Sequence, residues 1–191
     1  TGATAALLVA ISVAAYGVDA WLNYLHNIGV LRTVILEEGV GVSHRMVSVF
    51  VFARHLGASI GVSYAWQAVG ALVAAVVIVR SWWRGEPAHI RNAILLTGTC
   101  LATPYLQDYD LVFGAFVVVW LHMAEKDMKV LLQWVRGAMA RVLLFPPMNA
   151  PIAKFIGPSV GPLFFLPVLA LLVYLGAEYC RKRADERPAA S

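Results

Sequence analysis

The stretch GVSYAWQAVGALVAAVVIVRSWWR, residues 61–84, decides the fold class. It carries no charged side chain from Gly61 to Val79, and about 20 apolar helical residues cross the core of a bilayer. The stretch ends in basic and aromatic side chains of the kind that anchor helices at the membrane interface, namely Arg80, Trp82, Trp83 and Arg84. It therefore predicts a transmembrane helix.

The rest of the chain has the same apolar character. Of its 191 residues, 60% are hydrophobic and 14% charged, whereas soluble domains average about 45–50% apolar and about 25% charged residues. Further apolar runs cover residues 3–15, 88–128, 130–145 and 161–177. We therefore exclude a soluble globule and predict an all-α, polytopic transmembrane helix bundle, with about five spans plus an amphipathic surface helix.

The net charge of +4 reflects membrane topology rather than nucleic-acid binding, because the basic residues stand at the ends of apolar runs and form no aromatic-interleaved face. The positive-inside rule places three basic clusters in the cytoplasm. They are Arg80, Arg84 and Arg91; then Lys126 and Lys129; then Arg181, Lys182, Arg183 and Arg187.

These patterns predict one membrane domain over residues 1–191. Its expected parts are a span (1–17), an external amphipathic region (18–59), a span (60–80), a helical hairpin with an external YLQDYD turn (88–128), a second hairpin (130–178) and a cytoplasmic tail (179–191). A Pro- and Gly-rich link, residues 146–162, is expected to separate the last two spans. Because residue 1 is Thr and leads directly into an apolar run, we expect the C-terminal part of a longer chain.

The external region divides into two polar segments. A surface helix is expected from Asp19, a plausible N-cap, to a stop at Glu38 and Gly39. Residues 44–59 are too polar to span lipid alone, and we expect them to dip into the bilayer or lie against the bundle. Gln67, inside the next span, is expected to hydrogen-bond a neighbouring helix.

The most informative polar segment is YLQDYD, residues 105–110, which sets two carboxylates and two phenols between apolar spans. Polar groups at membrane depth are costly and tend to mark function. Three roles are open to Asp108 and Asp110: they bind a metal, orient a hydroxylated substrate, or cap the helix that begins near Leu111.

A second polar group is cationic. His44 and Arg45, with Arg54 and His55 nearby, lie on the same external side. Arg holds phosphate through paired hydrogen bonds, to which His44 adds a donor. The alternative is contact with lipid headgroups, which we favour for Arg54 and His55.

The motifs of nucleotide hydrolases, metalloproteases, serine hydrolases and dinucleotide-binding proteins are missing from the sequence. The sequence has no GxxxxGK[ST], HExxH, GxSxG or Gly-rich dinucleotide motif. Cys100 and Cys180 have no CxxC spacing and are expected to be small buried hydrophobes.

Several segments together resemble a known family. LATPYLQDYDLV (101–112) resembles the ATPYLxDYDLV segment of bacterial members of glycosyltransferase family 87. GVDAW (17–21), EEG (37–39) and HRMVSVF (44–50) resemble that family's loop and its HKMxSVF-type stretch. The resemblance covers most of residues 10–125.

The resemblance implies a membrane hexosyltransferase similar to the polyprenol-phosphate-mannose-dependent mannosyltransferases of the bacterial cytoplasmic membrane. Such enzymes take the sugar from a polyprenyl phosphate on the outer face and pass it to a lipid or glycan acceptor. An acidic residue in the first external loop serves as base, and cationic groups stabilise the departing phosphate. We expect that catalytic base upstream of this chain, so that the fragment alone is inactive.

Residue by residue, the resemblance assigns two sets. Asp108, Tyr109 and Asp110, with Tyr105, match the late motif and are expected to bind the sugar or acceptor, and His44 and Arg45 are expected to bind the lipid phosphate. Arg45 stands where the family pattern has Lys, which keeps the positive charge. No metal ligand or cofactor is assigned, and a divalent cation stays an open alternative.

Two other function classes compete. In a multi-pass transporter or flippase-like module, intramembrane charges would serve substrate passage instead: Asp108, Asp110, Arg136 and Arg141. An assembly scaffold without chemistry would tolerate replacement of the outer polar residues.

Overall fold

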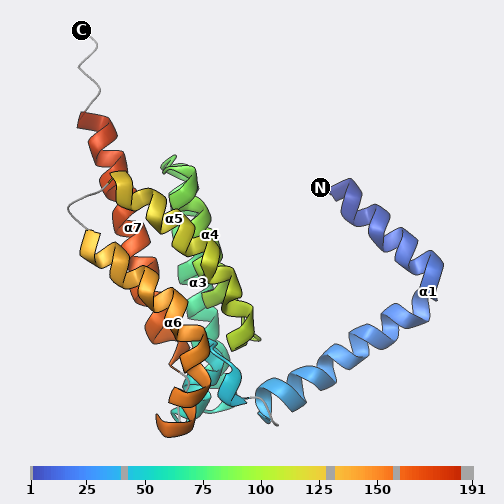
Figure 1. Cartoon of the computed structure of the whole chain (residues 1–191). Coiled ribbons are helices and arrows are strands. Elements are labelled where there is room, and N and C mark those ends of the chain that lie inside the picture. The colour runs from blue at the N-terminus through green and yellow to red at the C-terminus, as the bar shows by residue number, and fades with distance from the viewer. Residues whose placement is uncertain (1, 40–42, 128–131, 157–159, 186–191) are drawn as a thin grey trace. The chain divides into compact units, whose positions relative to one another are not determined.

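The computed structural model describes residues 2–39, 43–127, 132–156 and 160–185. Within these ranges the chain is built of helices, and it divides into two compact units, Thr1–Ser43 and His44–Ser191 (Figure 1). Lys129, Arg187 and part of the expected link, residues 157–159, lie outside the described ranges.

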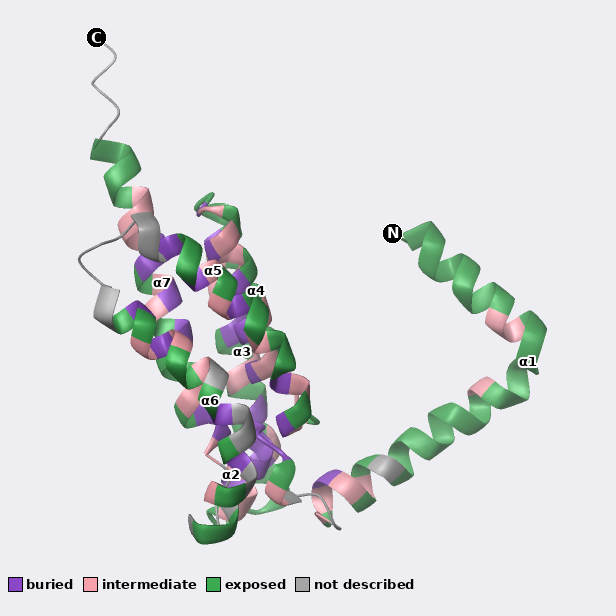
Figure 2. Ribbon diagram, in the orientation of Figure 1, coloured by how far each residue is buried: buried purple, intermediate pink, exposed green. Residues whose placement is uncertain are grey.

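The first unit is one long broken helix. α1 (Gly2–Leu31) kinks at Gly17, where φ is 80° and ψ is 164°, a backbone conformation that glycine adopts without steric cost. The indole Nε1 of Trp21 donates to Ser12 Oγ across the kink at 3.2 Å. A π-helical turn (Arg32–Glu37) follows, and an ion pair of 3.2 Å joins Arg32 to Glu37. Figure 2 shows this helix exposed along nearly its whole length. Many of the exposed side chains are apolar, which is typical of a helix that faces lipid.

The second unit is a helical bundle. Its long members are α3 (Ile60–Trp83), α4 (Ala88–Ala102), α5 (Gly114–Asp127), α6 (Leu132–Ile156) and α7 (Gly161–Asp185). α4 lies at the centre and packs on α3, α5 and α7, while α6 packs on α5 and α7 (Figure 1). The short helix α2 (Val49–His55) packs against α3 and α7, so the polar segment 44–59 lies against the bundle as expected.

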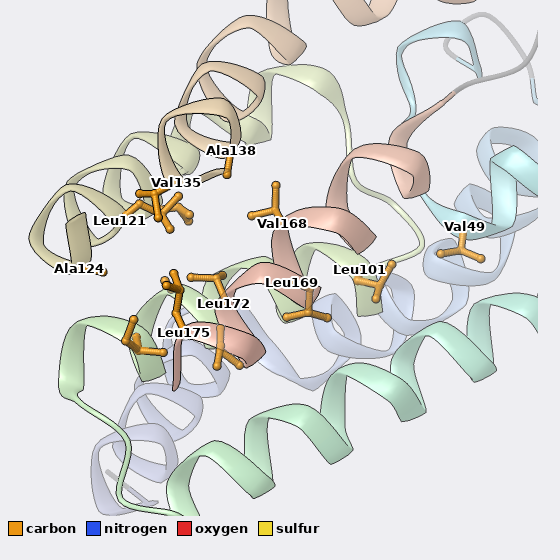
Figure 3. Packing of buried hydrophobic residues seen from close by; sticks show 14 residues of the cluster. Val49, Leu101, Leu121, Ala124, Val135, Ala138, Val168, Leu169, Leu172 and Leu175 are labelled. Carbon is orange, nitrogen blue, oxygen red and sulfur yellow. The ribbon is translucent and has the colours of Figure 1, made fainter. Parts of the chain in front are cut away.

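A large apolar core holds the bundle together. Side chains from α4, α5, α6 and α7 meet in it, and Val49 of α2 joins from the side (Figure 3). Its central members are fully buried, among them Ile94, Leu121 and Leu172. The outward faces of the same helices are exposed and apolar (Figure 2), which is the reverse of a soluble bundle.

The prediction of an all-α membrane helix bundle is confirmed. Among the described residues, three helical stretches are long and apolar enough to cross a bilayer: Gly2–Glu37, Ile60–Trp83 and Gly161–Asp185. About five spans were expected. α4 and α5 have 15 and 14 residues, so each is only about 21–23 Å long, shorter than a bilayer core of about 30 Å. α6 is long enough but carries Arg136, Arg141 and Lys154.

The expected break at Pro146 is wrong. α6 continues as a helix through Pro146, Pro147 and Pro151 and ends at Ile156. Proline removes one backbone N–H donor, yet membrane helices tolerate it where neighbouring groups satisfy the backbone again. α7 likewise runs through Pro167.

Candidate functional site

The YLQDYD segment lies between α4 and α5, and its last three residues begin a short 3-10 helix, η3 (Asp108–Phe113). The backbone N–H of Gln107 donates to Asp110 Oδ2 at 3.0 Å, so Asp110 closes the first turn of this helix. Of the roles open to the two carboxylates, capping therefore describes Asp110. Asp108, which is 7% exposed, points elsewhere.

Asp108 meets Arg45, a residue from the other polar segment. Arg45 Nε lies 3.2 Å from Asp108 Oδ1 and 3.3 Å from Oδ2, and Nη2 lies 3.1 Å from Oδ1. Nε thus donates to both carboxylate oxygens and Nη2 lies close to one of them, and hydrogen bonds between two charged groups are among the strong ones in proteins. The carboxylate raises the pKa of Arg45 through the hydrogen bond and then through its charge, so the cation is retained. The structure thus brings together the expected phosphate-binding residue and an expected substrate-binding residue.

The pair has one sheltered and one open side. The Asp108 side chain is 9% exposed, whereas the Arg45 side chain is 46% exposed. The guanidinium carbon of Arg45 also lies 5.7 Å from the ring centroid of Tyr109, within range of a cation–π contact, and that ring is itself exposed. Asp108 therefore holds the guanidinium from the protein side, and Tyr109 flanks it on the surface.

Backbone pairing fixes the two segments to each other. Met46 and Gln107 form an antiparallel bridge, and Val47 N donates to the Leu106 carbonyl at 2.9 Å. Arg45 precedes the bridge on one segment, and Asp108 follows it on the other. Their side chains consequently start from neighbouring points of one short ladder.

The ladder rests on apolar side chains. Val47, Leu106, Leu111 and Phe145 form a small buried cluster, and Phe164 of α7 stacks on Phe145 at 3.8 Å between ring centroids. Gly161, the first residue of α7, lies directly against Val47, and a Cβ there would overlap the Val47 carbonyl. The start of α7 therefore supports the site from below.

Gln67 ties the site to the middle of the bundle. From α3, its Oε1 accepts the Phe50 N–H at 3.0 Å, while its Nε2 donates to the carbonyls of Leu101 and Ala102 at 3.1 and 2.9 Å. The expectation that Gln67 bonds a neighbouring helix is confirmed. Gln67 thus provides hydrogen-bond partners for backbone groups at the start of α2 and at the end of α4.

With this geometry in place, the family can be assigned. The model of glycosyltransferase family 87 matches residues 1–104, more than half of the chain. The chain belongs to glycosyltransferase family 87. No curated protein and no solved structure matches it. The match includes His44 and Arg45 and ends just before Tyr105, so the YLQDYD segment joins the site through its contact with Arg45.

A family 87 chain is a membrane glycosyltransferase, which requires a sugar donor and an acceptor. Two more expected site residues lie beside the Arg45–Asp108 pair in sequence: His44 precedes Arg45 and is half-buried, and Tyr105 is 39% exposed at the start of the segment. Arg54 and His55 are engaged elsewhere. Arg54 Nη1 donates to the Ala58 carbonyl at 2.8 Å at the end of α2, and burial lowers the pKa of His55.

Among the described residues of the glycosyltransferase, no group of three or more His, Cys, Asp or Glu side chains converges. A narrow apolar crevice of about 40 Å³ does lie beneath η3, lined by Cys100 and Leu111 and bordered by Arg141.

The sequence did not signal the Arg45–Asp108 contact. The two residues are 63 positions apart and belong to segments that differ in pattern. The only available hint was that each segment carries one sign of charge on the same predicted side of the membrane.

Proposed function

We propose that this glycosyltransferase moves a hexose, mannose in the first instance, from a polyprenyl-phosphate donor to a lipid or glycan acceptor on the outer side of the cytoplasmic membrane. In this reaction the acceptor oxygen bonds to the anomeric carbon, the bond from that carbon to the phosphate oxygen breaks, and the lipid phosphate departs with its electron pair. The enzyme must therefore stabilise negative charge that grows on a phosphate at the membrane surface.

The observation that carries this proposal is Arg45 held side-on by Asp108 with its outer edge open. Nε and Nη2 face the carboxylate. The remaining N–H groups of the guanidinium are therefore able to donate hydrogen bonds to phosphate oxygens. Asp108 keeps the guanidinium in one orientation, so little conformational entropy is lost when phosphate binds. In this assignment Arg45 binds the phosphate and Asp108 is a positioning residue.

The neighbouring residues provide donors for the sugar. Tyr109 presents an exposed phenol beside the cation, Tyr105 presents a partly exposed one at the start of the YLQDYD segment, and His44 precedes Arg45 on the same 3-10 turn (Ser43–Arg45). Phenol and imidazole groups both donate to and accept from hydroxyls. We assign Tyr105 and Tyr109 to sugar or acceptor hydroxyls, and His44 to the phosphate alongside Arg45.

The two carboxylates are already engaged. Asp108 binds Arg45, and Asp110 binds the Gln107 amide. A general base needs an oxygen that is open to the acceptor proton. We therefore assign the base to neither residue, in keeping with an acidic base in another external segment.

The test is sugar transfer by the full-length enzyme from a polyprenyl-phosphate-mannose donor. Arg45→Ala should lower the rate about 100-fold or more, the usual cost of removing a group that stabilises charge in the transition state. Asp108→Asn, which keeps the size but loses the charge, should lower it by a smaller factor. Asp110→Asn should have the smallest effect of the three.

Arg54→Ala is the matched control, because Arg54 is the same residue type but donates to the Ala58 carbonyl. Its rate should stay within about twofold of the wild-type rate, the range of ordinary surface substitutions. Undiminished transfer in Arg45→Ala, Asp108→Asn and Asp110→Asn alike would reject the site.

A further inference from the structure

The end of the bundle formed by the α3–α4 turn and the end of α7 carries a second feature. Gly161 of α7 lies against Val47 beside the Arg45 site, and Gly176 of the same helix lies against Glu86 in the α3–α4 turn. Along α7 these two glycines are about 22 Å apart at about 1.5 Å per residue. The α3–α4 turn is therefore at the opposite end of the bundle from the Arg45–Asp108 pair.

A buried carboxylate shapes this turn. Glu86 is 1% exposed, accepts a hydrogen bond from Ser81 Oγ at 2.6 Å and lies 3.8 Å from Nη1 of Arg80. A side chain at position 176 would overlap it, so α7 passes very close to the turn. One turn later, the Cys180 thiol donates to the Arg84 carbonyl at 3.7 Å. The turn and α7 are thus fixed against each other.

Between them lies an open pocket of about 410 Å³. Its lining comes from two segments almost 100 positions apart: Arg84, Gly85, Cys180, Arg183 and Ala184. The two arginines enter from opposite walls, one from the end of α3 and one from the last turns of α7.

The two pocket arginines differ from the paired arginines beside them in sequence. Arg80 pairs with Glu86, and Arg181 pairs with Glu178 at 2.7 Å. In the part of the chain that the structure describes, neither Arg84 nor Arg183 has an acidic partner. Asp185 comes two residues after Arg183, which on a helix projects it from a different side.

The pocket also lies at the level of a membrane interface. Trp83, which immediately precedes Arg84 at the end of a candidate span, is 88% exposed, and Trp82 beside it is 41% exposed. Exposed tryptophans at a helix end mark the level of lipid headgroups. Two cations in one pocket at that depth match a phosphate group that is itself anchored in the bilayer.

We propose that this pocket binds the phosphate headgroup of an anionic phospholipid, held between Arg84 and Arg183 in the leaflet opposite the sugar-transfer site. The Arg84 and Arg183 guanidiniums contact the phosphate oxygens, and Trp83 lies beside the glycerol and the upper acyl chains. The binding does not depend on sugar transfer, since it uses none of the residues assigned to that reaction.

The experiment measures lipids retained by the purified full chain in neutral detergent, by native mass spectrometry. The probes are phosphatidylglycerol and phosphatidylcholine with the same acyl chains. The wild type should retain phosphatidylglycerol in preference to phosphatidylcholine. Arg84→Ala and Arg183→Ala should each weaken its binding about fivefold, the usual contribution of one basic residue near an anionic lipid surface.

Arg181→Ala is the matched control, because this residue stands two positions before Arg183 on α7, projects from a different side of the helix and is already paired with Glu178. It should retain phosphatidylglycerol as the wild type does. If Arg181→Ala loses as much phosphatidylglycerol as the pocket variants, the lipid is held by diffuse surface charge, and the proposed site in the pocket is wrong. If inorganic phosphate at equal concentration displaces phosphatidylglycerol, the pocket does not select a lipid, and the proposal is wrong. Both pocket arginines are exposed, so the lipid-free unfolding temperatures of their variants should match that of the wild type.

Discussion

The guanidinium of Arg45 lies side-on against the carboxylate of Asp108, with Nε within 3.3 Å of both oxygens and Nη2 3.1 Å from Oδ1. The contact joins two loops of the family 87 bundle at a point where the carboxylate is sheltered and the cation is half exposed. Such an arrangement costs less than a fully buried ion pair, because the cation keeps part of its hydration. It also presents a fixed positive charge to whatever binds from outside.

A side chain added at position 161 should destabilise the packing of α7 against the Met46–Gln107 ladder. Gly161→Ala sets a Cβ against the Val47 carbonyl, which the backbone can relieve only by moving, at a cost of about 1–3 kcal/mol. Thermal unfolding in detergent should show a lower midpoint. Gly61→Ala, in α3, is the control because no atom lies within 4 Å of its Cβ position. Equal midpoints for the two variants would contradict the close packing of α7 on Val47.

Replacing Gln67 should loosen α2. Gln67→Met keeps the length of the side chain but leaves the Phe50 N–H and two carbonyls without their partner, at a cost of about 1–3 kcal/mol. Hydrogen exchange should become faster at the Phe50 amide. Ser63→Ala, one turn earlier on α3, loses only a bond to the Ser59 carbonyl of its own helix and should leave that amide unchanged. Unaltered exchange in Gln67→Met would mean that Gln67 does not anchor α2.

The predicted and observed folds agree where the information is local. The run 61–84 contains both a long apolar stretch and its interface anchors, and α3 ends at Trp83 as that pattern requires. Gly17 followed by Asp19 marked a helix end, and the structure has its kink at Gly17. α6 differs because whether a helix survives proline depends on its neighbours in the bundle, which the local pattern does not contain.

The sequence singled out the polar residues of the candidate site but not the contacts between them. Asp108 and Asp110 carry the same side chain two positions apart, yet one binds Arg45 and the other closes a helical turn. Only the ladder between Met46 and Gln107 separates these roles, because it brings Arg45 within reach of one carboxylate. Contacts between segments so distant in sequence leave no periodic signal.

Asp110, which accepts the Gln107 N–H, should contribute to the stability of the protein more than to the rate of sugar transfer. Asp110→Ala removes the acceptor of the Gln107 N–H and should lower the free energy of unfolding by about 1 kcal/mol, the usual value of a helix cap. Sugar transfer at a temperature where the variant is folded should fall by less than about tenfold. A full loss of transfer with unchanged stability would instead place Asp110 in the reaction.

Acidic pH should weaken the bundle at α2. Burial lowers the pKa of His55 below its ordinary value of about 6.5, so the folded state favours the neutral imidazole. The unfolded chain then binds more protons as the pH falls through about 6.5, and stability falls until the folded-state pKa is passed. Unfolding midpoints should drop as the pH falls through about 6.5. His55→Gln should lessen that drop, and an equal drop in variant and wild type would exclude His55 as its source.

A double-mutant cycle on sugar transfer from the polyprenyl-phosphate donor tests whether Asp108 positions Arg45. If Asp108 acts by positioning Arg45, the Asp108 substitution has nothing left to disturb once Arg45 is gone. We therefore expect the kcat/KM of Arg45→Ala/Asp108→Ala to equal that of Arg45→Ala alone. Losses that multiply in the double variant would contradict it, because they would show that the two residues act independently.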